Sequence, residues 1–323
     1  MTRLREEAYR SAEAALGAAY GLETAEHTIT VDSDTTIRVL ESGTGEPIVL
    51  VHGSPNNAAT WFPLAAQFPD RRCLMVERPG AGLSDPLPTW TDHRSQSTAL
   101  IAAAMDQLDV PTADVVGSSF GGLYAYNVTL AHPRRVRSLI QLGSPAGPSV
   151  VGMPTIFRLL SLPLPRFLLR RALRPDIRGA EKMYREIGHG TTIDAGRISE
   201  AVFEWYSSLL CDTDTATHLL GEIRAIATPF GFRSAAELDD ETLAGIDVPV
   251  LHLWGSEDTF ADPSRGDALA RLTPAATIEH LPGYGHLPWY DDPAEVADRI
   301  RTFTSSNCDG PGGTEGAEES APY

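Results

Sequence analysis

The chain has 323 residues, of which 42% are hydrophobic and 21% charged, as in an ordinary globular protein of one large domain or two. Its formal net charge of −17 argues against nucleic-acid binding, because neutralising phosphates requires a basic face. Lys182 is the only lysine, which disfavours chemistry that depends on a lysine nucleophile.

The cysteines and the N-terminal sequence suggest a reducing compartment. Cys73, Cys211 and Cys308 lie far apart and form no C-x-x-C pair, so neither a disulfide framework nor a zinc site is indicated. The charged N-terminus lacks the apolar core of a signal peptide, and no apolar run is long enough to form a transmembrane segment. We therefore expect a cytoplasmic location.

The predicted elements alternate between strands and helices. Residues 2–20 predict an alanine-rich helix whose apolar face carries Leu4, Ala8, Ala12, Ala15, Leu16 and Ala19. Strand-like runs follow at residues 27–31, 36–42, 47–53, 73–80, 113–119, 135–143, 248–255 and 276–283. Helix-length segments lie between several of them, at residues 57–68, 92–108, 120–131, 263–272 and 293–304. This pattern predicts an α/β fold with a mostly parallel eight-stranded sheet, helices on both faces and ligands at the carboxyl ends of its strands.

Residues 146–246 interrupt this alternation. They contain helical patterns at 155–160, 166–173, 180–187 and 195–210 but no convincing buried strand. We interpret them as a helical cap, or lid, inserted into a core of residues 27–145 and 247–304. Residues 1–26 form a helical extension, and the acidic tail of residues 305–323 is expected to be disordered.

A G-x-S-x-G pattern provides the candidate nucleophile. Gly117, Ser119 and Gly121 follow a predicted strand and precede a predicted helix. In that context a sharp turn lifts the serine hydroxyl above the sheet, and the glycines avoid clashes in a strained backbone. Ser118 does not have a glycine two residues away on both sides, so Ser119 is the predicted nucleophile.

A serine hydroxyl needs a base to accept its proton, and the base needs an acid to orient it. His286 is the best placed of the nine histidines, because it follows the last predicted strand at the active edge of the sheet. Asp258 follows the preceding strand and is the predicted acid, although the adjacent Glu257 could be mistaken for it. The strand tip at residues 141–145 offers no carboxylate as an alternative.

Two backbone amides are candidates for an oxyanion hole. The amide of Ser54 lies in the loop after strand 47–53, and that of Phe120 follows the nucleophile directly. We predict a structural role for the neighbouring His52, whose imidazole would tie down the loop.

Five motifs occur in one order: HGSP (52–55), ERPGAGLSD (77–85), GSSFG (117–121), WGSED (254–258) and GYGHLPWYDDP (283–293). Over residues 27–304 the sequence thereby resembles the α/β-hydrolase superfamily. It is most similar to the capped branch that includes haloalkane dehalogenases, epoxide hydrolases, cofactor-free haloperoxidases and C–C bond hydrolases. The resemblance implies an α/β-hydrolase fold with Ser119, Asp258 and His286 as its triad.

Three departures narrow the activity that the resemblance implies. Dehalogenases and epoxide hydrolases of this branch have aspartate where this chain has Ser119, which argues against their chemistry. Hydroxynitrile lyases usually carry a lysine where this chain has Thr259. Glu77 stands where relatives commonly have aspartate, which is a conservative structural change.

These features predict a serine hydrolase that cleaves a small-molecule carboxylic ester or lactone through an acyl-enzyme, without a metal or organic cofactor. One alternative is a triad enzyme with other chemistry, such as a C–C bond hydrolase, a perhydrolase or haloperoxidase-like enzyme, a thioesterase or an acyltransferase. A second alternative is a ligand-binding protein that keeps the fold without turnover.

The cap offers aromatic residues for a substrate pocket, although helical packing also needs such residues. The candidates are Phe157, Trp205 and Tyr206, followed by Phe167 and Phe203.

Residues 158–185 hold seven arginines and Lys182 against two acidic residues. This segment could meet an anionic substrate, an acidic carrier protein or a membrane surface, although a solvated helix face is the simpler interpretation. The N-terminal helix could pack on the core or on a partner in a homodimer.

Overall fold

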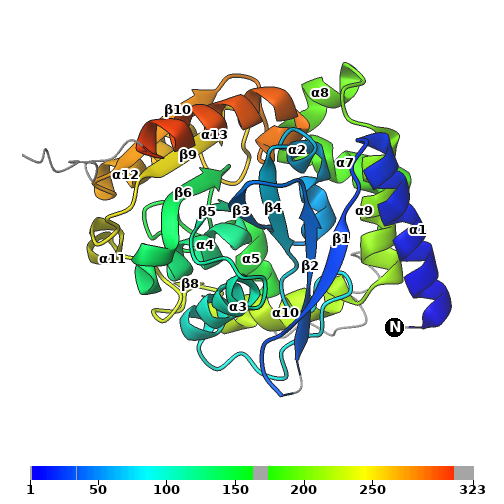
Figure 1. The fold of residues 1–323 in the computed structure, drawn as a ribbon, viewed down its shortest axis with the longest axis horizontal. Helices are drawn as coiled ribbons and strands as arrows, with labels where there is room; N and C mark the ends of the chain where they lie inside the picture. The colour runs from blue at the N-terminus through cyan, green and yellow to red at the C-terminus, as the bar shows by residue number, and fades with distance from the viewer. Residues whose placement is uncertain (1, 34, 163–173, 309–323) are drawn as a thin grey trace, which may run out of the picture.

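The computed structural model describes residues 2–33, 35–162 and 174–308. An eight-stranded sheet in the order β1-β2-β4-β3-β5-β6-β9-β10 forms its centre (Figure 1). The strands are β1 (Ala25–Thr30), β2 (Thr36–Ser42), β3 (Glu46–Val51), β4 (Arg71–Val76), β5 (Ala113–Ser118), β6 (Val136–Leu142), β9 (Val250–Gly255) and β10 (Ala276–Leu281). β2 runs antiparallel to β1 and β4, whereas the remaining neighbours are parallel. The predicted mostly parallel sheet of eight strands is confirmed.

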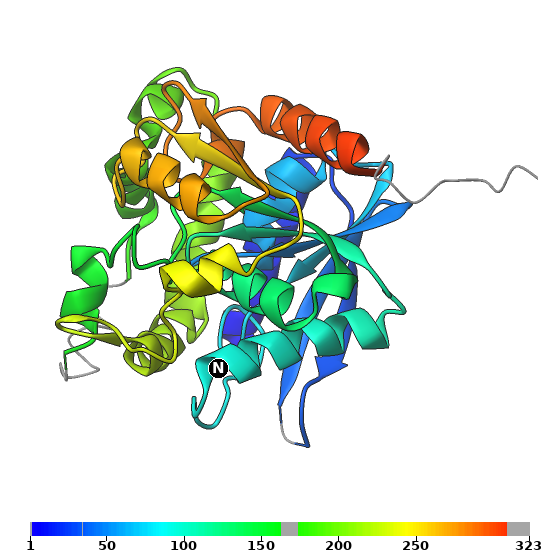
Figure 2. The same cartoon turned by 90° about the vertical axis from the view of Figure 1, so that its left-hand side faces the viewer.

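Helices cover both faces of the sheet, as predicted. Figure 2 shows α13 (Pro293–Cys308) and α2 (Phe62–Ala65) on one side and α3 (His93–Gln107) and α4 (Phe120–Ala131) on the other. α12 (Pro263–Leu272) contributes Leu269 to the core on the α3–α4 side. Alternate residues of each strand enter the two cores: Val49 and Val51 lie in one, Ile48 and Leu50 in the other.

The C-terminal helix is longer than the sequence predicts. α13 continues to Cys308, so residues 305–308, which we assigned to the tail, are helical. The rest of the predicted tail lies outside the described residues.

Residues 146–246, called the inserted segment below, enter between β6 and β9 and are mainly helical. Their elements are α5 (Thr155–Leu160), α7 (Ile177–Tyr184), a π-type turn (Arg185–His189), α8 (Gly190–Asp194), α9 (Glu200–Asp212), α10 (Thr215–Ile226), α11 (Asp240–Ala244) and the two-residue strands β7 (Ala227–Thr228) and β8 (Gly231–Phe232). The predicted helix at 166–173, with Phe167, lies outside the described residues.

The N-terminal helix α1 (Arg3–Ala19) lies along α9 of the inserted segment (Figure 1). Arg5 donates hydrogen bonds to the carbonyls of Cys211 (2.7 Å) and Thr213 (2.9 Å). The predicted apolar face is wrong in part, because Leu4 is 80% exposed. Leu16 of the predicted face is buried, together with Tyr9, Glu13 and Gly17, which were not predicted.

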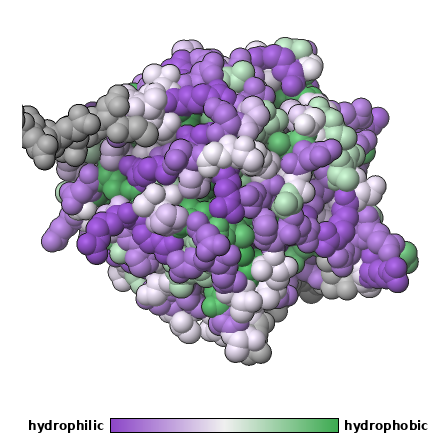
Figure 3. Space-filling model, in the orientation of Figure 1, coloured by the Kyte–Doolittle hydropathy of each residue, from purple (hydrophilic) through white to green (hydrophobic). Residues whose placement is uncertain are grey.

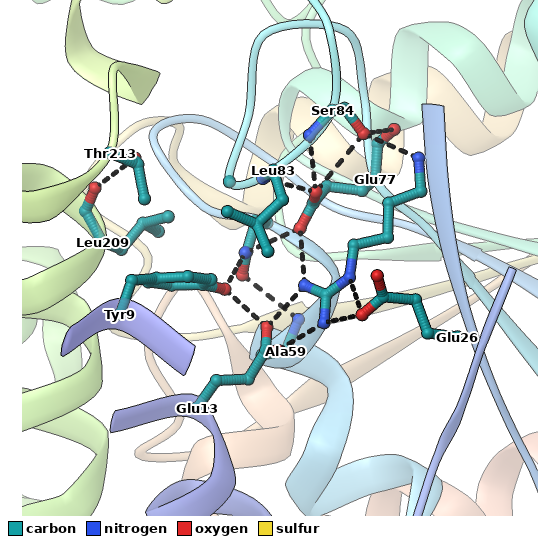
Figure 4. Close-up of polar contacts among 12 residues, drawn as sticks. Tyr9, Glu13, Glu26, Ala59, Glu77, Leu83, Ser84, Leu209 and Thr213 are labelled. Atoms are coloured by element: carbon teal, nitrogen blue, oxygen red, sulfur yellow. Dashed lines mark hydrogen bonds and ion pairs between the residues drawn. The ribbon is translucent and has the colours of Figure 1, made fainter. Parts of the chain in front are cut away.

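A buried polar network explains why α1 turns Tyr9 and Glu13 inward (Figure 4). Arg38 on β2 donates to both carboxylate oxygens of Glu13, at 2.9 and 2.5 Å. The Tyr9 hydroxyl donates to Glu13 (2.5 Å) and accepts from Asn57, whose amide also donates to Glu77 (2.7 Å). These contacts join the extension to the core of its own chain, while the homodimer stays a prediction.

Hydrophilic residues cover most of the face drawn in Figure 3, as expected for a chain with a net charge of −17. Within the described ranges, no helix is long and apolar enough to cross a membrane.

Candidate active site

The strand β5 turns sharply into α4 at Ser119. Ser119 has a φ of 51°, in the left-handed region that side-chain-bearing residues rarely adopt. A Cβ atom on Gly121 would lie 2.1 Å from the Val51 carbonyl oxygen, so this position accepts only glycine. Ser118 is fully buried in β5, whereas Ser119 is partly exposed at the tip of the turn. The local geometry is the one that the G-x-S-x-G pattern predicts.

Asp258 and His286 meet at the same edge of the sheet, from the loops after β9 and β10. His286 Nδ1 lies 2.8 Å from Asp258 Oδ2, and both side chains are buried. Asp258 also accepts the backbone N–H groups of Ser144 (2.8 Å) and Phe260 (2.9 Å). Burial alone would raise the Asp258 pKa, but His286 and these N–H donors together hold it below its ordinary value.

Ser119 and His286 line one small cavity of about 80 Å³. The Nε2 atom of His286 is buried and accepts no hydrogen bond from any described residue. Because Asp258 engages Nδ1, Nε2 is the nitrogen left to receive a proton within this cavity.

The predicted oxyanion residues lie beside Ser119. A Cβ atom on Gly53 would lie 2.8 Å from the Ser119 Cβ, so the Ser54 loop passes directly over the nucleophile. Phe120 is the first residue of α4, where backbone amides lack partners within the helix. His52 is fully buried and accepts the Arg78 N–H at Nε2 (2.9 Å), while its Nδ1 lies 2.8 Å from the Gly53 carbonyl. Burial lowers the pKa of His52, so its imidazole is neutral and joins the Gly53 carbonyl to the backbone of Arg78.

A larger cavity of about 410 Å³ lies against Ser119 under the inserted segment. Most of its walls are apolar, and Glu186 is the one charged residue among the described residues that form them. The wall includes Pro145, Ala146, Val151, Pro154, Ile156, Phe157, Leu160, Met183, Ile187, Leu219 and Phe260.

Two of the three predicted pocket residues line these cavities: Phe157 the larger and Tyr206 the smaller. Trp205 lines neither; it is fully buried, with its ring centroid 6.2 Å from that of Tyr206. Consecutive helical residues point about 100° apart, so Trp205 and Tyr206 of α9 cannot share one face.

Asn56, Ser144, Ile187 and Phe260 are among the residues of the site that the sequence did not reveal. Ser144 Oγ lies 3.3 Å from His286 Nδ1, at the strand tip where we sought only a carboxylate. The available signal was position alone, since Ser144 follows β6 at the carboxyl edge of the sheet.

The basic stretch at 158–185 is partly neutralised within the chain. Arg185 forms ion pairs with Glu181 (2.8 Å) and Asp194 (2.7 Å), and Lys182 pairs with Glu186 (3.6 Å). Its arginines at 166, 170 and 171 lie outside the described residues. No group of three or more metal-ligating side chains occurs in the part of the chain that the structure describes.

The fold and the turn at Ser119 define the class of an α/β-hydrolase. The sequence matches the alpha/beta hydrolase family over residues 48–299, and the chain belongs to this family. It is a hydrolase of the α/β type, as the resemblance implied.

Individual relatives point to more than one chemistry. A 2-hydroxy-6-oxononadienedioate/2-hydroxy-6-oxononatrienedioate hydrolase of Cupriavidus pinatubonensis is 28% identical over 274 residues, 79% of this chain and 86% of that protein. The carboxylesterase CesB of Bacillus subtilis superposes with a TM-score of 0.74 at 21% identity, covering 94% of this chain and 99% of that one. The esterase RhEst1 of a Rhodococcus species gives a TM-score of 0.64 at 24% identity, covering 87% and 98%. These structural similarities establish the fold.

Proposed function

We propose that this hydrolase cleaves small, neutral carboxylic esters or lactones through an acyl-enzyme on Ser119. The observation that carries the proposal is the buried His286–Asp258 pair, whose unpartnered Nε2 opens into the cavity that Ser119 lines. The inserted segment acts as the cap that closes this site.

In the proposed cycle, His286 accepts the Ser119 proton as Oγ attacks the substrate carbonyl. The amides of Ser54 and Phe120 stabilise the negative charge on the carbonyl oxygen. His286 then protonates the leaving alcohol and activates the water that releases the acid. Asp258, held ionised by its three donors, fixes the imidazole and stabilises its charged form.

The two cavities suggest which part of the substrate each side of Ser119 binds. The larger cavity has a volume of about 410 Å³, which falls within the range of small-molecule sites, and its walls suit an apolar acyl group. The smaller one, with about 80 Å³, has room for about two or three water molecules and is lined by Asn56, Tyr206 and His286. The carboxamide oxygen of Asn56 is buried there without a partner among the described residues. We assign this side to a short polar alcohol and to the hydrolytic water.

A second candidate, C–C bond hydrolysis, is favoured by the relative from Cupriavidus pinatubonensis. That protein's named substrate is a dioate and carries two carboxylates. A dianion in the larger cavity would face Glu186, and no arginine or lysine stands among the described residues of either wall. An unpaired charge is costly to bury, so the walls favour the neutral ester.

A panel of neutral esters, lactones, thioesters and vinylogous diketone acids tests the proposal. We expect turnover of apolar acyl esters with short alcohols, labelling of Ser119 by a fluorophosphonate, and loss of both in Ser119→Ala. Faster cleavage of the diketone acid than of any ester would replace the ester proposal with C–C chemistry. Failure of folded wild-type protein to label would refute the serine mechanism.

A further inference from the structure

The loop that carries His286 is bonded through three consecutive backbone amides. The N–H of Gly285 donates to the Asp291 carboxylate (2.9 Å) and that of His286 to the Ile187 carbonyl (2.9 Å). The N–H of Leu287 donates to Nε2 of His189 (3.2 Å). Two of the three acceptors, Ile187 and His189, belong to the inserted segment.

The same stretch of the inserted segment reaches the loop of the predicted acid. The hydroxyl of Thr259, next to Asp258, donates to the Glu186 carbonyl (3.0 Å). The chain achieves this approach by bending in the π-type turn Arg185–His189, where Gly188 has a φ of 100°. A Cβ atom on Gly188 would lie 2.2 Å from the Glu257 carbonyl oxygen and 2.8 Å from Gly285 Cα.

His189 also contacts a buried carboxylate. It is fully buried, and its Nδ1 lies 2.9 Å from Oδ2 of Asp291, the same oxygen that accepts the Gly285 N–H. The other Asp291 oxygen accepts the hydroxyl of Thr192. Because Nε2 accepts the Leu287 N–H, the imidazole must carry its proton on Nδ1, facing Asp291. The ring therefore connects a fixed carboxylate to the backbone beside His286.

We propose that His189 is a positioning residue for His286, which it orients through the backbone of residues 285–287. The catalytic imidazole must stay aligned with both Ser119 and Asp258, and a misplacement of about 1 Å in such a site can lower the rate about 100-fold. We call this arrangement of His189, Asp291 and the backbone of residues 285–287 the clamp. It rests on the proposed triad. It assigns the inserted segment a part in catalysis besides covering the substrate.

The test compares His189→Leu, His189→Gln and His189→Asn with the wild-type enzyme. Leucine removes both polar contacts and should lower kcat about 10- to 100-fold. KM should stay within about twofold, because His189 lines neither cavity. Glutamine can place an acceptor where Nε2 lies and should recover most of kcat. Asparagine places its amide only near the Nδ1 position and should not. If His189→Leu fails to fold, the contrast between glutamine and asparagine decides.

His252→Leu is the matched control. His252 is fully buried in β9, and neither ring nitrogen has a partner among the described residues. Its replacement should leave kcat within about threefold, the scatter expected for a change that leaves the site aligned. Equal kcat losses in His189→Leu and His252→Leu, or equal losses in the glutamine and asparagine variants, would refute the clamp.

Amide hydrogen exchange tests the clamp independently of activity. The amides of residues 285–287 should exchange slowly in the wild-type protein and faster in His189→Leu and His189→Asn. Unchanged exchange would overturn the clamp even if the triad is active. An inactive, unlabelled wild type with the expected exchange pattern would instead refute the proposed function and leave the contact with the loop established.

Discussion

Single residues with unusual backbone conformations mark the places where loops of this hydrolase meet. Ser119 and Gly188 both have positive φ values, 51° and 100°. At Ser119 the strained turn exposes a hydroxyl, and conformations of this kind cost about 1–3 kcal/mol for residues with a side chain. At Gly188 the absence of a side chain lets the inserted segment touch the loops after β9 and β10.

Replacing Gly188 with alanine should destabilise the protein by about 2 kcal/mol or more, because the methyl group meets backbone atoms in an unfavourable φ region. Gly190→Ala is the control, since Gly190 has a φ of −56° and nothing lies within 4 Å of its Cβ position. That change should be neutral or stabilising by up to about 1 kcal/mol. Urea unfolding of both variants measures the difference, and equal effects would contradict the close approach at Gly188.

At the scale of elements, α1 is attached to the core through charged groups as well as through apolar contacts. Glu77, in the loop after β4, accepts N–H groups from Leu83 (2.8 Å) and Ser84 (3.0 Å) and lies 3.6 Å from Arg38. Burial raises its pKa to about 7, although Arg38 opposes the shift. Glu13 of α1 is a second negative charge on the same arginine and adds to the rise (Figure 4).

This pKa predicts a pH-dependent stability. A carboxyl whose pKa is higher in the folded than in the unfolded state destabilises the fold as it ionises, here as the pH rises from about 4.5 to about 7. Glu77→Gln cannot ionise, so its stability relative to wild type should increase over that range. Glu41→Gln is the control, because hydrogen bonds from Arg72 lower the Glu41 pKa and its contribution is lost only as the pH falls below about 4.5. The free energy of unfolding of Glu77→Gln and of wild type is measured at pH 5, 6 and 7. A difference between the two that does not change with pH would contradict the raised pKa.

The sequence predicted those elements whose pattern is local. All eight strands of the sheet were found, within a few residues of their ends. The buried parallel strands are continuous apolar runs, whereas the antiparallel strands β1 and β2 were recognised as shorter strand-like runs. Ser119, Asp258 and His286 could be placed because strand order fixes the edge of the sheet where such residues gather. The face of α1 was partly mistaken, since its alanines match the helical period but Tyr9 and Glu13 find buried partners. The contact of His189 with Leu287 spans 98 residues of sequence and has no local pattern.

At the scale of the whole molecule, a buried ion pair joins the inserted segment to the core. Arg78, after β4, donates to Glu222 of α10 at 2.5 Å, and both are buried. Arg78 also donates to the carbonyls of His52 (3.0 Å) and Gly53 (3.2 Å), and its guanidinium lies 4.7 Å from the Phe120 ring centroid. One arginine therefore contacts both segments that supply the proposed oxyanion hole, the loop that carries Ser54 and the start of α4 at Phe120, while it is paired with the inserted segment.

Glu222→Gln should destabilise the protein by about 3–5 kcal/mol, because it leaves the Arg78 charge buried without its counterion. Arg78→Met should cost a similar amount, because it removes the guanidinium counterion of the buried Glu222, which then keeps only its contacts with Tyr124 and His93. The double variant should lose less than the sum of the two, by about 1–3 kcal/mol, since neither charge is then left alone. Chemical denaturation at pH 7 measures this cycle. The exposed pair Arg185–Asp194 provides the control, and Asp194→Asn should leave the free energy of unfolding unchanged. If the losses in the free energy of unfolding are additive, the Arg78–Glu222 interaction does not contribute to stability. The inserted segment would then be held to the core by its apolar contacts.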